Sequence, residues 1–326
     1  MPDDHEQPDD GWCLYRGTGE FRHGIRHLPQ PPPWRGANSE YRARTYRIGD
    51  DECFQVNVAV QLRRPLLVAG RPGSGKTSLA DSIAHELNLG SVLRWSITSE
   101  SRLTDGLYAY DAIGRLQDAS LPSGPGEGRD DIGRYFRLGP LGTALLPHDR
   151  PRVLLIDNLD RSDVALPDEL LDKLGDGQFG IPELERLPGE SSEVEVYTAD
   201  PDTPDGRARL HRGKVTGGDA PVVVITSNGE REFGPDFRQR CVELTLRPPS
   251  REQLAAIVTA HLGPGFLEQH APFTNELLDR AAHHGTPVER VLDALYAATS
   301  GDQEPGEEVR KRLPDVLLRS PGAAGF

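Results

Sequence analysis

Residues 70–77 have the types and spacing that bind the phosphates of a nucleotide. They read Gly-Arg-Pro-Gly-Ser-Gly-Lys-Thr and fit the pattern G-x-x-x-x-G-K-[ST]. Gly73 and Gly75 allow successive backbone N–H groups to turn inward around a β-phosphate. Lys76 then reaches the β- and γ-phosphates, and the Thr77 hydroxyl is a ligand for Mg²⁺. The alternative is a chance glycine-rich turn, but an apolar run precedes the loop and a helical pattern follows it, which favours the phosphate-binding loop.

A phosphate-binding loop also needs a carboxylate on the metal side, at the end of a second strand. The apolar run 153–156 ends in Asp157, which is expected to hold Mg²⁺ through water. A buried strand that merely ends in Asp is the alternative. The residues predicted to bind Mg-ATP are Gly70, Arg71, Pro72, Gly73, Ser74, Gly75, Lys76, Thr77, Ser78 and Asp157, of which Thr77 and Asp157 are the predicted metal ligands.

The residue after Asp157 is Asn158, where many ATPases have a glutamate that polarises the attacking water. An amide can orient water through its carbonyl oxygen, but it cannot take the proton. The sequence therefore supports nucleotide binding better than it supports fast hydrolysis.

Three more polar residues are candidates for a role in catalysis. Asn228 follows the apolar run 222–226 and is placed to touch a γ-phosphate or the lytic water, although an Asn after a strand is more often a turn residue. Arg240 could point out of the domain towards a neighbour's nucleotide, or it could simply be a solvated surface residue. Arg290 lies in a helical pattern near the C-terminus and could equally be a salt-bridged surface residue.

These residues must be positioned by alternating strands and helices. Apolar runs at 65–69, 153–156 and 222–226 predict strands, and helical patterns follow the first two at 78–88 and 163–177. We therefore expect an α/β fold with a mostly parallel sheet and a smaller helical domain.

Other segments have weaker patterns. Residues 50–62 and 108–119 are predicted to be helical, and the alternation in 193–216 around a turn-rich centre predicts a β-hairpin. The acidic and proline-rich start of the chain predicts an extension in which Trp34 anchors on the main domain.

Composition excludes several classes of protein. The net charge is −14 and only four of the 37 cationic residues are lysines, which argues against a nucleic-acid motor or a coat on an anionic membrane. The three cysteines match neither a disulfide framework nor a zinc site. Because the first residues lack an apolar run and no stretch is long enough to span a bilayer, we expect a soluble, cytoplasmic protein without a membrane partner.

Taken in order, these motifs resemble the AAA+ ATPases, and within them the MoxR-type group. The resemblance covers about residues 50–300. It is carried by the segments LRRPLLVAGRPGSGKTSLA, VLRWSITS, GLYAYDAIGRLQDA, RYFRLGPLGTALLP, PRVLLIDNLDRSD, LPDELLDKLGDGQFGIPEL and VVVITSNGEREFGPDFRQRC.

The resemblance implies a role for each candidate residue. Lys76 and Thr77 would be the Walker A pair and Asp157 the Walker B aspartate. Asn228 would be sensor 1, Arg240 the arginine finger and Arg290 sensor 2. Members of this group form nucleotide-dependent rings, usually hexamers, and act as chaperone-like remodelling ATPases on partner proteins. Bacterial relatives often resemble parts of conflict or stress systems.

The resemblance also implies an architecture: a three-layer αβα sandwich with a parallel central sheet, plus a small C-terminal helical lid. The expected divisions are an N-terminal extension 1–45, a nucleotide-binding domain 46–248, a helical lid 249–300 and a tail 301–326. Within the nucleotide-binding domain, about 100–150 would be the helix-2 insert and about 193–216 the hairpin before sensor 1.

Two positions depart from the pattern of the group. Asn158 stands where I-D-E-[IL]-D has its glutamate, and residues 238–241 read R-Q-R-C in place of L-R-R-C. Two hypotheses therefore remain open: a ring ATPase that remodels a partner protein or effector, and a hydrolysis-poor, ATP-dependent switch that gates the assembly of a complex.

Overall fold

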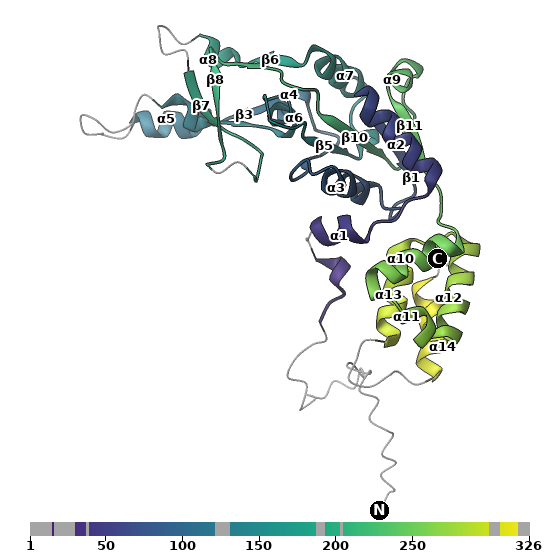
Figure 1. The fold of residues 1–326 in the computed structure, drawn as a ribbon. Helices are drawn as coiled ribbons and strands as arrows, with labels where there is room; N and C mark the ends of the chain where they lie inside the picture. Colours follow the sequence, from purple (N-terminus) through teal and green to yellow (C-terminus); the bar gives the residue numbers. More distant parts are fainter. Residues whose placement is uncertain are drawn as a thin grey trace, which may run out of the picture. The chain divides into compact units, whose positions relative to one another are not determined.

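The computed structural model describes residues 15, 30–36, 39–120, 131–186, 193–202, 205–299 and 307–318. The chain divides into two compact units (Figure 1). The α/β unit is Ile48–Leu246, and the helical unit consists of the described residues before and after it.

The α/β unit is built on a five-stranded sheet in which every neighbouring pair of strands is parallel. The strand order is β11-β1-β10-β5-β2. The strands are β1 Leu66–Gly70, β2 Leu93–Ser96, β5 Val153–Asp157, β10 Val222–Ser227 and β11 Val242–Leu246. All six residues of β10 are buried, as expected of a strand covered on both faces. The three strands that bear the candidate site were predicted from their apolar runs.

Helices cover both faces of this sheet. Leu67, Ile156 and Ile225 share one apolar cluster with Leu170 of α7 (Leu166–Asp176). Because side chains alternate along a strand, the neighbouring residues point to the opposite face, which packs against α3 (Lys76–Glu86). The result is the P-loop αβα architecture that the sequence predicts. The remaining helices here are α2 Asp50–Leu62, α9 Pro235–Arg240 and the 3₁₀ helix η3 Leu159–Arg161.

A second, mixed sheet of six strands was not expected from the sequence. Its order is β3-β4-β7-β8-β9-β6. The strands are β3 Tyr108–Tyr110, β4 Phe136–Leu138, β6 Gln178–Gly180, β7 Glu193–Tyr197, β8 Arg207–His211 and β9 Lys214–Thr216. The antiparallel pairing of β7 with β8 confirms the predicted hairpin. The shorter elements around this sheet are α4 Leu103–Leu107, η2 Ile132–Tyr135, α6 Pro140–Ala144 and α8 Pro182–Glu185.

The prediction of one helix over 108–119 is wrong for its first turn. Residues 108–110 form β3, which pairs antiparallel with β4, and the helix α5 is Ala112–Ser120. Tyr110 stacks on Phe136 of β4, with ring centroids 4.4 Å apart. The Asp111 carboxylate accepts the Gly114 N–H at 2.7 Å and so caps the helix at its actual start. A cross-strand aromatic contact thus outweighs the local helical pattern.

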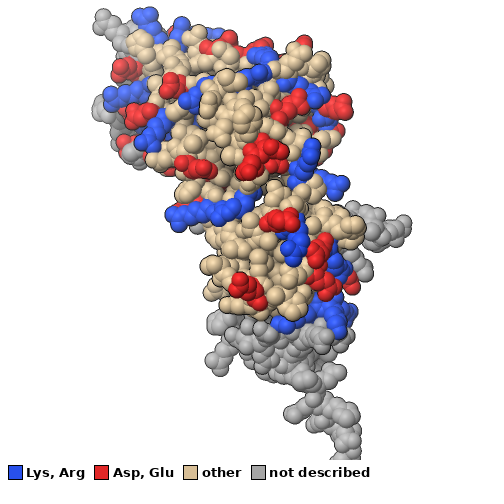
Figure 2. All heavy atoms as spheres, turned by 45° about the vertical axis from the view of Figure 1, so that its right-hand side comes forward, with Lys and Arg blue, Asp and Glu red and all other residues tan. Residues whose placement is uncertain are grey.

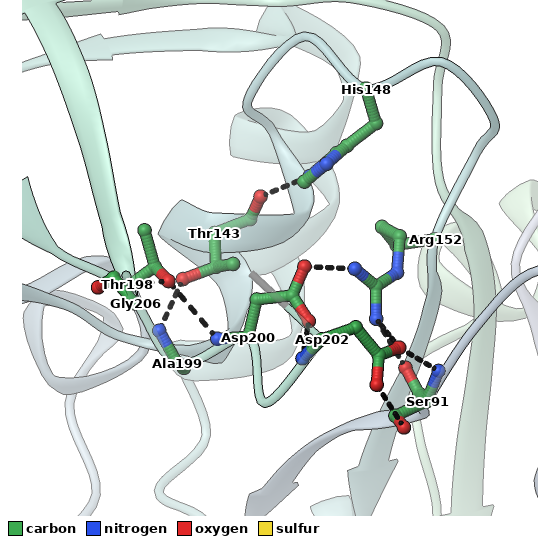
Figure 3. A network of polar contacts seen from close by, with 9 residues as sticks. All are labelled: Ser91, Thr143, His148, Arg152, Thr198, Ala199, Asp200, Asp202 and Gly206. Carbon is green, nitrogen blue, oxygen red and sulfur yellow. Dashed lines mark hydrogen bonds and ion pairs between the residues drawn. The ribbon is translucent and has the colours of Figure 1, made fainter. Parts of the chain in front are cut away.

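A buried arginine ties the hairpin to the central sheet (Figure 3). Arg152, directly before β5, forms an ion pair with Asp200 after β7, and it also donates to the Ser91 carbonyl at 2.8 Å and to Asp202 at 3.1 Å. Burial acts to raise the pKa of Asp202, but hydrogen bonds from Ser91 and the charge of Arg152 outweigh it, so the pKa lies below its ordinary value. We call these residues the Arg152 clasp.

The helical unit contains α1 Ser39–Thr45, α10 Arg251–Leu262, α11 Phe266–Gln269, α12 Ala271–His284, α13 Val288–Thr299 and α14 Glu307–Leu317, with the 3₁₀ helix η1 Pro33–Arg35. Leu254, Leu277 and Leu292 form its core with Leu318. Within the expected tail 301–326, α14 packs on this unit: Leu313 and Leu318 bury their side chains, which stabilises the segment. Among the described residues, no helix has both the length and the apolar character that crossing a bilayer requires.

Trp34 anchors on the helical unit rather than on the main domain, which corrects the sequence-based expectation. Its indole N–H donates to Asp293 at 2.9 Å, and its ring meets His261 and Tyr296 edge-on. A tryptophan buries well where one apolar surface and one acceptor for its N–H lie together, and α10 and α13 supply both. Most of residues 1–29 lies outside the described part of the chain.

Candidate functional site

The loop between β1 and α3 has the backbone that phosphate binding requires. Gly73 and Gly75 have φ angles of 76° and 89°, a region that L side chains rarely adopt. A Cβ on Gly70 would lie 2.9 Å from Ser74 Oγ and 3.0 Å from the Leu246 carbonyl, so this approach also excludes a side chain. The helix α3 begins at Lys76, so its unpaired N–H groups and positive dipole end lie at the loop.

Lys76 lies inside this loop. Its side chain is only 6% exposed, and its Nζ donates to the carbonyls of Gly70 at 2.8 Å and Arg71 at 3.0 Å. Burial lowers the pKa of Lys76, while the charges of Asp157 and Asp160 act to raise it. The ammonium group is thus close enough to feel the charges of Asp157, at the end of β5, and of Asp160, in the turn after it.

The sheet brings Thr77 and Asp157 together from positions 80 residues apart. Asp157 Oδ1 accepts a hydrogen bond from Thr226 Oγ1 at 2.6 Å and one from Thr77 Oγ1 at 3.3 Å. Thr226 is fully buried in β10, next to β5, and sequence analysis did not identify it as a site residue. A hydroxyl after four apolar residues in a buried strand was the signal that could have found it.

These groups fit a magnesium nucleotide. A hydroxyl and a carboxylate are the oxygen ligands that Mg²⁺ uses beside waters and phosphates, and Thr77 and Asp157 supply them. Ser74 Oγ, within the loop, is buried without a hydrogen-bond partner among the described residues, so it has a free polar atom for a ligand. The described residues contain no group of three or more His, Cys, Asp or Glu suited to a metal.

Asn158 and Asn228 contact each other directly. Asn228 Nδ2 donates to Asn158 Oδ1 at 2.7 Å, and the Asn158 backbone N–H donates to Thr226 Oγ1 at 2.8 Å. The Asn158 φ angle is 62°, in the left-handed region that Asn tolerates better than most residues. The two amides that the sequence predicts to be catalytic therefore lie side by side at the ends of β5 and β10.

Arg240 has a partner within the α/β unit. It lies at the end of α9, and its Nη1 donates to Asp172 of α7 at 2.7 Å, with both side chains largely exposed. The neighbouring Arg238 forms a two-bond pair with Glu243. An arginine that completes a neighbour's site must be exposed, and Arg240 meets this requirement.

Arg290 belongs to the other unit. It lies in the first turn of α13, where its backbone N–H donates to the Pro287 carbonyl at 3.0 Å. Its role in nucleotide binding stays a prediction.

Residues 66–166 match the model of a family described as "ATPase family associated with various cellular activities (AAA)". This part of the chain is similar to the AAA family. The match begins at β1 and runs through the phosphate-binding loop and Asp157 to the first residue of α7. The matched segment therefore includes Lys76, Thr77 and Asp157.

The similarities of the whole chain to known proteins are distant. No curated protein matches the sequence. Among solved structures, the chain is similar to the Thermotoga maritima RuvB Holliday junction branch migration motor, with 16% identity, a TM-score of 0.42 and coverage of 85% of this chain and 73% of that one. It is also similar to Brucella abortus NtrX in complex with ADP, with 15% identity, a TM-score of 0.42 and coverage of 86% and 58%. Neither similarity bears on what this chain binds or does.

Proposed function

We propose that this chain is a MoxR-like AAA+ ATPase that binds Mg-ATP and, as a ring oligomer, remodels or assembles a partner protein complex. The observation that carries the proposal is that Lys76, Thr77 and Asp157 lie together at the carboxyl ends of the strands of a parallel sheet, a group that we call the junction. The match of residues 66–166 to the AAA family supports it.

Each residue of the junction has a distinct task. When bound, Mg²⁺ would neutralise charge on the phosphates, and Thr77 Oγ1 and Asp157 Oδ1 would hold it. Lys76 would exchange its bonds to the Gly70 and Arg71 carbonyls for bonds to phosphate oxygens, which are stronger because both partners are charged. Backbone N–H groups from Gly73 to Lys76 would surround the β-phosphate.

Hydrolysis is proposed to be slow, because the position next to Asp157 holds an amide. Asn158 has no basicity with which to draw a proton from water, and its Oδ1 already accepts a hydrogen bond from Asn228. This pair favours a second candidate function: an ATP-dependent switch or assembly factor whose nucleotide-bound state is long-lived.

The proposed partners are further copies of this chain and a protein substrate or effector, not a nucleic acid. The net charge of −14 supports this choice. On the face drawn in Figure 2, acidic and basic side chains are interspersed, a distribution unlike the basic stripe typical of nucleic-acid binding.

Substitution of the loop lysine tests the proposal. Lys76→Ala should lower the affinity for a fluorescent ATP analogue more than 100-fold, because it removes the loop's cation from the phosphates. Lys173→Ala is the matched control, since Lys173 pairs with Asp176 on the surface of α7, and it should bind as the wild type does. Unchanged affinity in Lys76→Ala would overturn the phosphate-binding assignment.

A further inference from the structure

The turn after β5 and the loop after β10 are joined by a buried carboxylate. Asp160, in η3, is 4% exposed, and its Oδ2 accepts two backbone hydrogen bonds from the facing loop. These come from the N–H groups of Asn228 and Glu230, each at 2.9 Å. One oxygen thus holds both ends of a three-residue segment whose first member is Asn228.

The geometry argues against Asp160 as the group that activates water. The Oδ2 atom of Asp160 already accepts two hydrogen bonds from backbone N–H groups. The Oδ1 atom is buried and has no hydrogen-bond partner among the described residues. A general base must lie within reach of the water that it deprotonates. A carboxylate enclosed in this way instead fixes the backbone that bonds to it.

Other contacts join the same two segments, but they are more exposed. Arg161 donates two hydrogen bonds to Glu230, and both side chains are half exposed. Arg231 donates to Ser162 Oγ at 3.2 Å. Exposed ion pairs contribute little to stability, whereas hydrogen bonds to a buried charge are among the strong ones. Asp160 is therefore the dominant attachment of the loop.

We propose that Asp160 is a positioning residue for Asn228: through the backbone of residues 228–230 it holds the Asn228 side chain against Asn158. The proposal rests on the proposed ATPase function, because the position of Asn228 matters only if a nucleotide is processed there. It explains why an acidic residue is buried three positions after Asp157, in the same turn that carries Asn158.

Two substitutions of increasing severity test this role. Asp160→Asn keeps the shape and a neutral acceptor oxygen, and Asp160→Ala removes the acceptor. We expect kcat for ATP hydrolysis to fall about 10-fold in Asp160→Asn and at least 100-fold in Asp160→Ala, with the dissociation constant for ATP changed less than threefold. Amide hydrogen exchange at residues 228 and 230 should accelerate at least 10-fold in both variants, which reports on the loop independently of turnover.

Asp163 offers a matched control from the same turn. Its Oδ1 also accepts hydrogen bonds from two backbone N–H groups, but these belong to Ala165 and Leu166 at the start of α7 and not to the loop of Asn228. Asp163→Asn should leave kcat and the exchange of residues 228 and 230 unchanged.

The outcomes separate the two proposals. Unchanged exchange at residues 228 and 230 in Asp160→Ala would overturn the positioning role, and so would accelerated exchange with an unchanged kcat. A parallel loss of kcat and ATP affinity would also overturn it, because that pattern indicates general damage to the site. Failure of the wild type to bind ATP would overturn the proposed function instead, while the exchange measurement would still test whether Asp160 holds the loop.

Discussion

At the scale of single residues, Asn158 meets two demands at once. Its backbone is left-handed, with a φ angle of 62°, and its side chain pairs with Asn228 at 2.7 Å. Asn adopts left-handed backbone readily because its short side chain can form hydrogen bonds locally. A glutamate in the same conformation would lower the stability of the turn by about 1 kcal/mol. Asn158 thus suits this turn in two ways: it tolerates the left-handed backbone, and its side chain accepts the hydrogen bond from Asn228.

Asn158→Glu decides between the enzyme and the switch. We expect kcat to rise at least tenfold with little change in KM, because the new carboxylate acts mainly in the transition state. The measurement is steady-state phosphate release, with Asn158→Gln as a control for side-chain length without charge. Brisk turnover by the wild type, unaffected by Asn158→Glu, would show that another residue activates the water and would rule out the switch.

At the scale of elements, the hairpin β7–β8 depends on the Arg152 clasp. Arg152 and Asp200 are both buried, and they join the loop after β7 to the segment before β5. Buried ion pairs are costly to break from one side, because the remaining charge has no counterpart. The clasp therefore links the second sheet to the sheet that carries the proposed nucleotide site.

Arg152→Met should lower the free energy of unfolding of the α/β unit by about 3–5 kcal/mol, because it leaves Asp200 buried and unpaired. The double variant Arg152→Met/Asp200→Leu should recover most of that loss, since it removes both charges. Denaturant unfolding measures both effects. If the single variant and the wild type had the same free energy of unfolding, the ion pair would make no net contribution to stability.

The anchoring of the N-terminal segment on the helical unit has a pH dependence. His261 lies beside Trp34 and 3.0 Å from the Tyr41 hydroxyl, and burial, with the charge of Arg47, lowers its pKa to about 4. The folded state thus binds fewer protons than the unfolded state, whose histidine titrates near pH 6.5. The contribution of neutral His261 to the stability of the folded helical unit is therefore complete above about pH 6.5 and is lost as the pH falls towards 4.

We therefore expect the helical unit to lose on the order of 1–2 kcal/mol between pH 7 and pH 4 through this group, after allowance for its partial exposure. His261→Gln should remove this part of the pH dependence. Thermal unfolding of both proteins across this range gives the comparison, and identical pH profiles would contradict the assignment.

At the scale of the whole molecule, the prediction concerns self-assembly. If Arg240 completes a neighbour's site, Arg240→Ala should leave the ATP affinity of the monomer nearly intact while weakening nucleotide-dependent oligomerisation or turnover within the oligomer. Light scattering with and without ATP measures the first effect. Asp172→Ala is the control, since it removes only the partner of Arg240 within the chain. A wild type that stays monomeric in ATP would contradict the ring.

The sequence alone determined the strands β1, β5 and β10, the phosphate-binding loop and the residues Lys76, Thr77 and Asp157. These features depend on local order: an apolar run predicts a buried strand, and a loop that surrounds a phosphate needs glycines and a lysine at set spacings. The carboxyl ends of neighbouring parallel strands lie together, which is why Asn158 and Asn228, each just after one of these strands, meet in the structure.

Only the tertiary structure decided the contacts between distant segments. Three of these contacts join residues from different elements. They are the pairing of β3 with β4, the packing of Trp34 against α10 and α13, and the hydrogen bonds from Asn228 and Glu230 to Asp160. Such contacts leave no periodicity in the sequence, because each depends on which surfaces the folded chain brings together. Local patterns therefore identified the groups that we propose to bind phosphate, whereas packing decided which side chains hold them in place.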